Sequence, residues 1–446
     1  MSGFLDTVQT RVSEPFLAMN RRLTVRALER KLAQRPGSAP FVGDPDSMLY
    51  VAASALPYHT SGYTTRTHEV IRALAAAGGR VYPLTRPGYP GDRADRLRDG
   101  AGSETQVGEV RYLHANAPFN NRPVLMYALQ AAPVVAQLAV QHRVSVIHAA
   151  SNHVNALPAL LAARRLGIPF QYEMRGLWEL TRISRMPEYE VRQGFRQGLE
   201  LEGLVARHAD RLFVISAQLG RFARDRWGIP EGRMHLLPNC VDPVRFVPSA
   251  PQDIDAGTIG YAGSLIGYEG LDTLIDAVGR LVAQGRALRV EIVGEGEARP
   301  ALEAQVQRLG LSAHIRFLGR TSPEQARATL GRCALVCIPR KPFRVCEIVP
   351  PIKLVEALAM GKPVIVPDLP VFRDEMGPKP AGWFFKAGDA ADLARVIETA
   401  LADRDTLTAL SGRAREYAAT QRRWHEFVIN ALPMSQGEGS NGRQGH

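Results

Sequence analysis

The chain has 446 residues, of which 45% are hydrophobic and 22% charged. This length predicts two sizeable domains, and the composition excludes a disordered or fibrous protein. The formal net charge of +11 is compatible with nucleic acid, anionic lipid or phosphorylated ligands as partners. The basic residues are nearly all dispersed arginines, and only 7% of residues are aromatic, so we expect no nucleic-acid partner.

The first 46 residues predict a basic amphipathic extension followed by a linker. Residues 1–40 hold seven basic and three acidic side chains, and apolar residues recur at near-helical spacing between them. A helix in residues 1–35 could lie on an anionic membrane, or equally pack on its own protein or on a partner. The N-terminus lacks the basic and apolar regions of a secretory signal.

The cysteines and the apolar segments indicate the compartment. The four cysteines show no C-x-x-C spacing, which favours reduced, buried thiols and a cytoplasmic protein; it could be peripheral on the inner face of the cell membrane. The stretch Val124–Val140 is interrupted by Gln130, Pro133 and Gln137. We therefore predict a buried helix pair there rather than a membrane span.

From Met48 onward, short β-rich runs alternate with helical stretches. This rhythm is typical of parallel sheets, and it occurs in two consecutive series of similar size. We predict an α/β protein with two Rossmann-like domains facing a cleft, an N-terminal domain over 47–240 and a C-terminal domain over 241–405. Helices over 406–431, returning to the N-terminal domain, precede a disordered tail over 432–446.

Ligands of open α/β sheets bind at the carboxyl ends of the strands, so the loops that follow strands hold the candidate site residues. Ser61-Gly62 opens a helix after the first strand and could bind a diphosphate, or simply form a turn. Glu173 and Arg175 end another strand, where they could hold an acceptor or form an internal ion pair. Gly263 and Gly294 follow strands of the second series and would allow a ligand to approach the backbone closely.

The most informative segment is IPRKPFRVCEIVPPIKLVEALAMGKPVIVPD. Arg340 follows a strand, Glu347 precedes two prolines, and Lys353 and Glu356 lie three residues apart on the next helix. Carboxylates can accept hydrogen bonds from sugar or ribose hydroxyls, and cations can neutralise a departing diphosphate. We prefer this functional interpretation to a surface Lys–Glu pair.

These segments resemble the family 4 glycosyltransferases, which are retaining enzymes with the GT-B fold. The resemblance covers about residues 48–431 and includes PYHTSGYTTRTHEV, LPNCVDPVRF, IVGEGEARP and PPIKLVEALAMGKPVIVPD. The RGLWE and PPIKLVEA stretches are similar to a subgroup associated with exopolysaccharide biosynthesis. The resemblance implies that the domain over 47–240 is the acceptor side and that the domain over 241–405 binds the donor substrate, a nucleotide-diphosphate sugar. It implies no metal or other cofactor.

The resemblance also assigns residues. Ser61, Gly62 and Tyr63 would approach the diphosphate and the transferred sugar, and Glu356 would hold the ribose hydroxyls. The donor site would be lined by Gly294, Glu295 and Gly296, with Arg320 and Thr321 near the base.

The chain departs from the family pattern at three places. The family has two glutamates eight residues apart, whereas Glu347 and Glu356 are nine apart. Gly263-Ser264-Leu265 and Glu269-Gly270 replace the usual basic pair, so Arg340 and Lys353 become the candidates for the diphosphate. Arg175 stands where many members carry a histidine.

We therefore expect a retaining hexosyltransferase that uses a UDP-, GDP- or ADP-sugar and a glycan or lipid-linked acceptor in polysaccharide or glycoconjugate biosynthesis. Its catalytic candidates are Lys353, Arg340, Glu347 and Arg175. The alternatives are a nucleotide-sugar epimerase or phosphorylase and a non-catalytic subunit that binds a sugar nucleotide.

Overall fold

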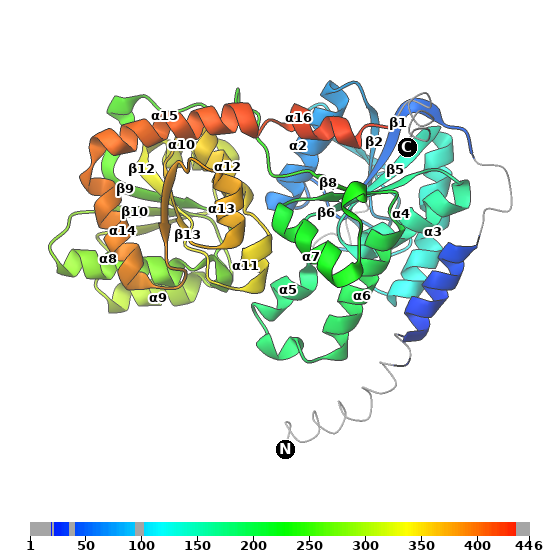
Figure 1. Cartoon of the computed structure of the whole chain (residues 1–446), viewed down its shortest axis with the longest axis horizontal. Helices are drawn as coiled ribbons and strands as arrows, with labels where there is room; N and C mark the ends of the chain where they lie inside the picture. The colour runs from blue at the N-terminus through cyan, green and yellow to red at the C-terminus, as the bar shows by residue number, and fades with distance from the viewer. Residues whose placement is uncertain (1–18, 20–21, 35–40, 94–101, 434–446) are drawn as a thin grey trace, which may run out of the picture. The chain divides into compact units, whose positions relative to one another are not determined.

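A computed structural model describes residues 19, 22–34, 41–93 and 102–433, and it divides into two compact units (Figure 1). The first unit contains the described residues up to Ile215, Leu219–Leu237 and those from Phe427 onward; the second contains Ser216–Gln218 and Pro238–Glu426. The residues over which C-terminal helices were predicted, 406–431, are helical for the most part and are divided between the two units at Glu426 and Phe427. All but the first two residues of the predicted tail, 432–446, lie outside the described residues.

The first unit is built on an eight-stranded sheet with the order β3-β4-β2-β1-β5-β6-β7-β8. Neighbouring strands are parallel except for β3 and β4, which form an antiparallel hairpin that the sequence analysis did not predict. The strands are β1 (Asp44–Ala52), β2 (Arg80–Thr85), β3 (Glu104–Val107), β4 (Val110–Leu113), β5 (Val144–Ala150), β6 (Phe170–Met174), β7 (Arg211–Val214) and β8 (Met234–Leu236).

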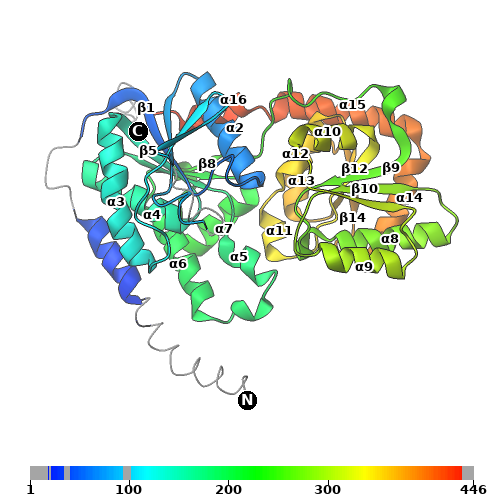
Figure 2. The same ribbon diagram turned by 180° about the vertical axis from the view of Figure 1, so that it is seen from behind.

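Helices cover this sheet, and α3, α4 and α6 pack on one another in turn. Figures 1 and 2 show these three helices together on one side of the unit. The helical elements of residues 62–233 are α2 (Gly62–Ala76), α3 (Val124–Gln141), α4 (His153–Leu166), α5 (Trp178–Ile183), η1 (Pro187–Tyr189), α6 (Gln193–His208), α7 (Ala217–Trp227) and η2 (Glu231–Arg233).

The predicted buried helix pair is one continuous helix, α3, which contains Pro133. Pro133 is exposed, whereas Tyr127, Ala131 and Val135 line the buried face that packs against α4. Packing of this face offsets the backbone hydrogen bond that a proline removes. By length and composition α3 is also the one described helix that could cross a membrane.

The second unit contains a six-stranded parallel sheet with the order β11-β10-β9-β12-β13-β14. Its strands are β9 (Asp255–Ala262), β10 (Arg289–Val293), β11 (Ile315–Gly319), β12 (Cys333–Cys337), β13 (Val364–Pro367) and β14 (Gly382–Phe385). Two of the four cysteines, Cys333 and Cys337, lie in the buried strand β12, and all four are free and buried.

Apolar periodicity explains how the helices attach to this sheet. In α8 (Leu271–Ala283), Leu271, Leu274, Ile275, Val278 and Leu281 are buried at helical spacing. Figures 1 and 2 show α8 and α9 on one side of the sheet and α10 and α12 on the other. The remaining helical elements are η3 (Pro251–Asp253), η4 (Gly267–Glu269), α9 (Arg299–Arg308), α10 (Pro323–Arg332), α11 (Arg344–Ile348), α12 (Ile352–Ala359), α13 (Pro370–Met376), α14 (Ala390–Ala402) and α15 (Arg404–Gln421).

Two terminal segments pack on the first unit. The C-terminal chain returns to it through the end of α16 (Trp424–Val428) and η5 (Ile429–Ala431), and Arg211 Nη1 donates to the carbonyl of Asn430 at 2.7 Å. At the other end, residues 22–33 are helical and Leu28 and Leu32 are buried. This part of the extension packs on its own protein, whereas residues 1–18 lie outside the described residues.

Candidate functional site

Each sheet has a point where the strand order reverses, between β1 and β5 in the first unit and between β9 and β12 in the second. Such points open a crevice at the carboxyl ends of the strands, where ligands of α/β folds bind. In the second unit, Gly263 directly follows β9 and Arg340 follows β12 by three residues. Both predicted site residues therefore lie at the point that the topology favours.

A buried ionic cluster occupies this position in the second unit. Glu269 Oε1 accepts from Arg340 Nε at 3.2 Å and Nη2 at 2.8 Å, and Glu269 Oε2 accepts from Lys353 Nζ at 2.8 Å. Lys353 Nζ also donates to the Tyr261 hydroxyl at 2.7 Å and lies 4.1 Å from the centre of that ring. We call Tyr261, Glu269, Arg340 and Lys353 the Glu269 cluster.

The charges of the cluster depend on one another. Burial alone would raise the pKa of Glu269, but Arg340 and Lys353 outweigh burial and lower the pKa to about 2. Burial lowers the pKa of Lys353, and Glu269 opposes that shift. Because two cations face one carboxylate, one net positive charge remains to attract an anion at this end of the sheet.

The two predicted glycine turns lie against each other beside the Glu269 cluster. The amide of Gly263 donates to the carbonyl of Val293 at 2.9 Å. A Cβ at Gly294, where φ is +139°, would lie 1.8 Å from the carbonyl oxygen of Gly263, and a Cβ at Gly263 would lie 2.5 Å from Lys353 Nζ. Only glycine fits both turns, so the backbone there is open to close approach.

The other predicted donor-site residues lie around these turns. Ser264 accepts through its carbonyl from the Tyr261 hydroxyl at 2.9 Å. Glu295 forms an ion pair with Arg299 on α9, and Gly296 packs on Leu265, since a Cβ there would lie 2.1 Å from the Leu265 carbonyl oxygen. Gly294 donates its amide to the carbonyl of Gly319 at 2.8 Å, which brings this turn to the end of β11, where exposed Arg320 and half-buried Thr321 follow.

The two predicted glutamates lie on different helices. Glu356 and Lys353 share α12, and each lies near enough to act on the other's charge. Glu347 lies on the five-residue helix α11, in the loop between β12 and α12, and is half-buried. The extra residue in the spacing therefore belongs to a loop that forms its own short helix.

In the first unit, the predicted residues Ser61, Gly62 and Tyr63 begin α2. Ser61 is the N-cap and forms a capping box: its Oγ accepts from the amide of Thr64, and Thr64 Oγ1 accepts from the amide of Ser61 at 3.0 Å. The Tyr63 hydroxyl accepts from the amide of Ala53 at 3.0 Å. The helix start is thus fixed by side chains at the carboxyl end of β1.

Arg175 belongs to a second buried cluster, centred on Glu173 at the end of β6. Glu173 Oε2 accepts from Arg175 Nη2 at 2.8 Å and from the Tyr50 hydroxyl at 2.6 Å, and Glu173 Oε1 accepts from Arg66 Nη2 at 2.8 Å. Arg175 also lies 4.7 Å from the centre of the Tyr63 ring. The internal ion pair that was one of the two interpretations of Glu173 and Arg175 is present.

The arginines control the charge of this second cluster. Burial would raise the pKa of Glu173, but Arg175 and Arg66 hold the pKa well below its usual value. Arg175 is only 6% exposed, and it joins α2 to the end of β6 through Thr67 Oγ1 at 2.6 Å. This position gives it the contacts of a positioning residue for the start of α2.

Glu269, Tyr261 and Arg66 were not predicted as site residues. Glu269 was noted only as the replacement of a basic residue, yet an acid beside Gly270, in a unit whose predicted site holds the cations Arg340 and Lys353, was the signal for a buried ion pair. Within the residues that the structure describes, no group of three or more His, Cys, Asp and Glu side chains could hold a metal ion.

The geometry of two α/β units with their candidate residues at the strand ends defines the GT-B class of proteins, and comparison with known proteins agrees. The Thermosynechococcus elongatus sucrose-phosphate synthase structure covers 86% of this chain and 97% of its own, with a TM-score of 0.70 and 18% identity. The Anabaena HepE structure in complex with UDP and glucose covers 86% and 98%, with a TM-score of 0.64 and 18% identity.

Family models then specify the family. The model described as "Glycosyl transferase 4-like domain" matches residues 61–240, and the model described as "Glycosyl transferases group 1" matches residues 249–417. The chain belongs to the family 4 glycosyltransferases, as the resemblance implied. One curated relative is the D-inositol 3-phosphate glycosyltransferase of Nocardia farcinica, 28% identical over 49% of this chain and 51% of its own. The chain matches only about half the length of such curated relatives.

Proposed function

We propose that the protein transfers a hexosyl group, with retention, from a nucleotide-diphosphate sugar to a hydroxyl of a glycan or lipid-linked acceptor. The observation that carries the proposal is the Glu269 cluster, in which Arg340 and Lys353 lie beside the Gly263 and Gly294 turns at the strand-order reversal of the second sheet. Membership of a glycosyltransferase family supports it. So does the HepE structure, which holds UDP and glucose.

The chemistry follows from the charges. The bond between C1 of the donor sugar and the diphosphate oxygen breaks, the acceptor oxygen bonds to C1 on the same face, and the acceptor proton leaves with the diphosphate. Lys353 and Arg340 would offset the charge that develops on the departing diphosphate, because Glu269 neutralises only one of them. Open backbone at the glycine turns would let the diphosphate approach closely.

The remaining predicted residues keep the roles that the family resemblance gave them. Glu356, one turn after Lys353 on α12, would hold the ribose hydroxyls. Glu347 matches the sugar-binding glutamate of the family only approximately, since Ile348 occupies the usual place, and it would contact the transferred sugar. A lipid-linked acceptor would suit a protein at the inner face of the cell membrane. The exposed arginines on the helix over residues 22–33, which are Arg22, Arg26 and Arg30, would then face anionic lipid.

A thermal-shift panel of UDP-, GDP- and ADP-sugars, followed by turnover of the stabilising one, tests the proposal. The Lys353→Ala variant should lose about 100-fold in turnover, the usual effect of removing one group that stabilises transition-state charge. Lys386→Ala is the matched control, since Lys386 lies in the same unit with its side chain 79% exposed. Wild-type turnover in Lys353→Ala would contradict the proposal, and binding without transfer would favour the non-catalytic alternative.

A further inference from the structure

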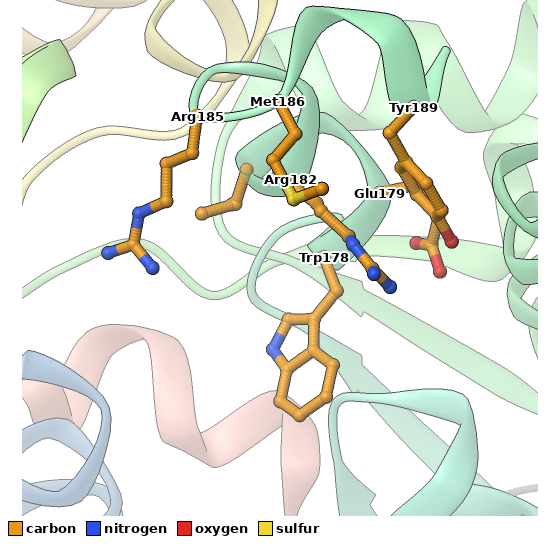
Figure 3. A pocket seen from close by; sticks show the side chains of 7 residues that line it. Trp178, Glu179, Arg182, Arg185, Met186 and Tyr189 are labelled. Atoms are coloured by element: carbon orange, nitrogen blue, oxygen red, sulfur yellow. The ribbon is translucent and has the colours of Figure 1, made fainter. Parts of the chain in front are cut away.

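The first unit contains a pocket of about 470 Å³ that none of the predicted site residues lines. Its lining residues lie in α5, in η1 and between them, and the first of them, Trp178, comes three residues after Arg175 in the chain. Figure 3 shows its lining side chains, chiefly Trp178, Glu179, Arg182, Arg185, Met186 and Tyr189. Its volume is in the range of small-molecule sites, which combine an apolar wall with a few polar groups.

Trp178 gives the pocket an exposed aromatic wall. Trp178 is 67% exposed, which is unusual for an apolar residue of this size. An indole presents a broad apolar face, and a ligand ring that covers it removes apolar area from water. The apolar face of a sugar ring has the right shape for this contact.

Glu179, which also lines the pocket, has a buried hydrogen-bond acceptor that lacks a partner within the described part of the chain. The residue is only 6% exposed, and among the described residues its Oε2 has no hydrogen-bond partner. A buried carboxylate oxygen without a donor is costly, so such atoms point to a missing partner. The space for this carboxylate exists because residue 198 on α6 is glycine: a Cβ there would lie 1.9 Å from Glu179 Oε1.

The charged side chains that line the pocket favour a ligand that carries both a hydroxyl group and a negative charge. Burial raises the pKa of Glu179, while neighbouring His153 opposes the rise and Glu202 adds to it. The guanidinium groups of Arg182 and Arg185 also line the pocket, and Arg182 lies 4.1 Å from the centre of the Tyr189 ring. The ring holds the guanidinium in place, and the pocket carries two positive groups against one buried carboxylate.

We propose that this pocket binds an anionic saccharide, with a sugar ring on Trp178, a hydroxyl donating to Glu179 Oε2, and a carboxylate or phosphate facing Arg182. If the proposed function holds, that saccharide is the acceptor, or part of it, and the negative charge becomes a requirement of the acceptor. The saccharide class rests on the pocket alone; its role as acceptor rests on the proposed function.

Binding is tested first, without any donor. Ligand-observed NMR of the full chain uses glucuronate, glucose 6-phosphate, neutral methyl glucoside and inorganic phosphate as probes. We expect glucuronate or glucose 6-phosphate to bind better than methyl glucoside and inorganic phosphate, and the stronger of the two identifies the anionic group. No binding by either anionic sugar, or equal binding of inorganic phosphate, would overturn the proposal.

Three variants assign the contacts. Trp178→Ala and Glu179→Gln should each weaken binding of the preferred probe about tenfold, while Arg182→Gln should remove the preference for the anionic sugar over methyl glucoside. Arg196→Gln is the control, because Arg196 is an exposed arginine on α6 that does not line the pocket. Loss of binding in the control, or full binding in Glu179→Gln with an unchanged melting temperature, would overturn the assignment.

A kinetic measurement separates this inference from the proposed function. If the chain transfers sugar, the Trp178→Ala variant should raise KM for the acceptor more than it raises KM for the nucleotide sugar. An unchanged acceptor KM would reject the acceptor role of the pocket and leave the transferase standing. If no nucleotide sugar is turned over but the anionic sugar still binds, the proposed function fails and the pocket remains a saccharide site.

Discussion

At the scale of single residues, Glu269 is the centre of the donor-side candidate site. It is 3% exposed and binds both cations that we assign to the diphosphate. A carboxylate in this position prevents two buried positive charges from repelling each other before a ligand arrives. It therefore sets the charge that the diphosphate would meet.

The Glu269→Gln variant should destabilise the protein by about 3 kcal/mol at neutral pH, because it leaves two buried cations without their counter-charge. Unfolding by urea measures the change. Glu324→Gln is the control: Glu324 pairs with Arg327 near the start of α10, and its side chain is 72% exposed. We expect the unfolding midpoint of this variant to stay at the wild-type value. A neutral result for Glu269→Gln would mean that the cluster is not formed.

The same carboxylate predicts a pH dependence. The pKa of Glu269 falls from 4.5 to about 2 on folding, so its stabilising contribution is complete above pH 4.5 and is lost as the pH falls through 2. The difference corresponds to about 3 kcal/mol. Unfolding free energies measured from pH 6 down to pH 2 should fall more steeply for the wild type than for Glu269→Gln, and parallel curves would contradict the assignment.

At the scale of elements, the strand-to-helix turns carry the site. The turns after β9 and β10 are joined by backbone hydrogen bonds, and they lead from the sheet to the helices α8 and α9. Their conformation is available to glycine and to few other residues. The backbone conformation of these two turns therefore shapes the candidate site.

Gly294→Ala should cost about 3 kcal/mol, because the new Cβ would meet the Gly263 carbonyl and the positive φ would be strained. Gly285→Ala separates the two effects: Gly285 has φ +78°, but a Cβ there would meet nothing within 4 Å, so only about 1 kcal/mol is expected from strain. Thermal unfolding of both variants measures the loss of stability. Equal losses in the two variants would show that the turns do not contact each other.

At the scale of the whole molecule, the first unit is built from two separate parts of the chain. The chain leaves that unit near Leu237, forms the second unit, and returns with Phe427. Val428 and Ala431 are completely buried after this return. The first unit is therefore complete only when the end of the chain is in place.

The Val428→Asp variant should destabilise the first unit by about 4 kcal/mol, since it places a charge in an apolar site. Its neighbour Ile429 is 53% exposed, so Ile429→Asp should change stability by less than about 0.5 kcal/mol. Hydrogen exchange of the peptides in β1 and β2 reports on the first unit. If both variants exchange like the wild type, the C-terminal segment does not stabilise that unit.

The predictions from sequence agreed best with the structure where they rested on residues that are close together in the chain. The helix α8 is an example of such a local pattern, because its apolar spacing and the preceding Gly270 specify it independently of the rest of the chain. Lys353 and Glu356 were placed on one helix for the same reason. In contrast, Pro133 suggested a break that packing against α4 overrides, and the β3–β4 hairpin was missed because its strands are only four residues long.

The sequence by itself determined the family, the two α/β series and the positions of the glycine turns, since each rests on residues close together in the chain. Only the tertiary structure brought Glu269 to Arg340 and Lys353, which lie 71 and 84 residues away, and Glu173 to Arg66, 107 residues away. It also left Oε2 of Glu179, beside Gly198, without a hydrogen-bond partner among the described residues. Partners of buried charges are chosen by the register of strands and the packing of helices, and neither property can be read from neighbouring residues.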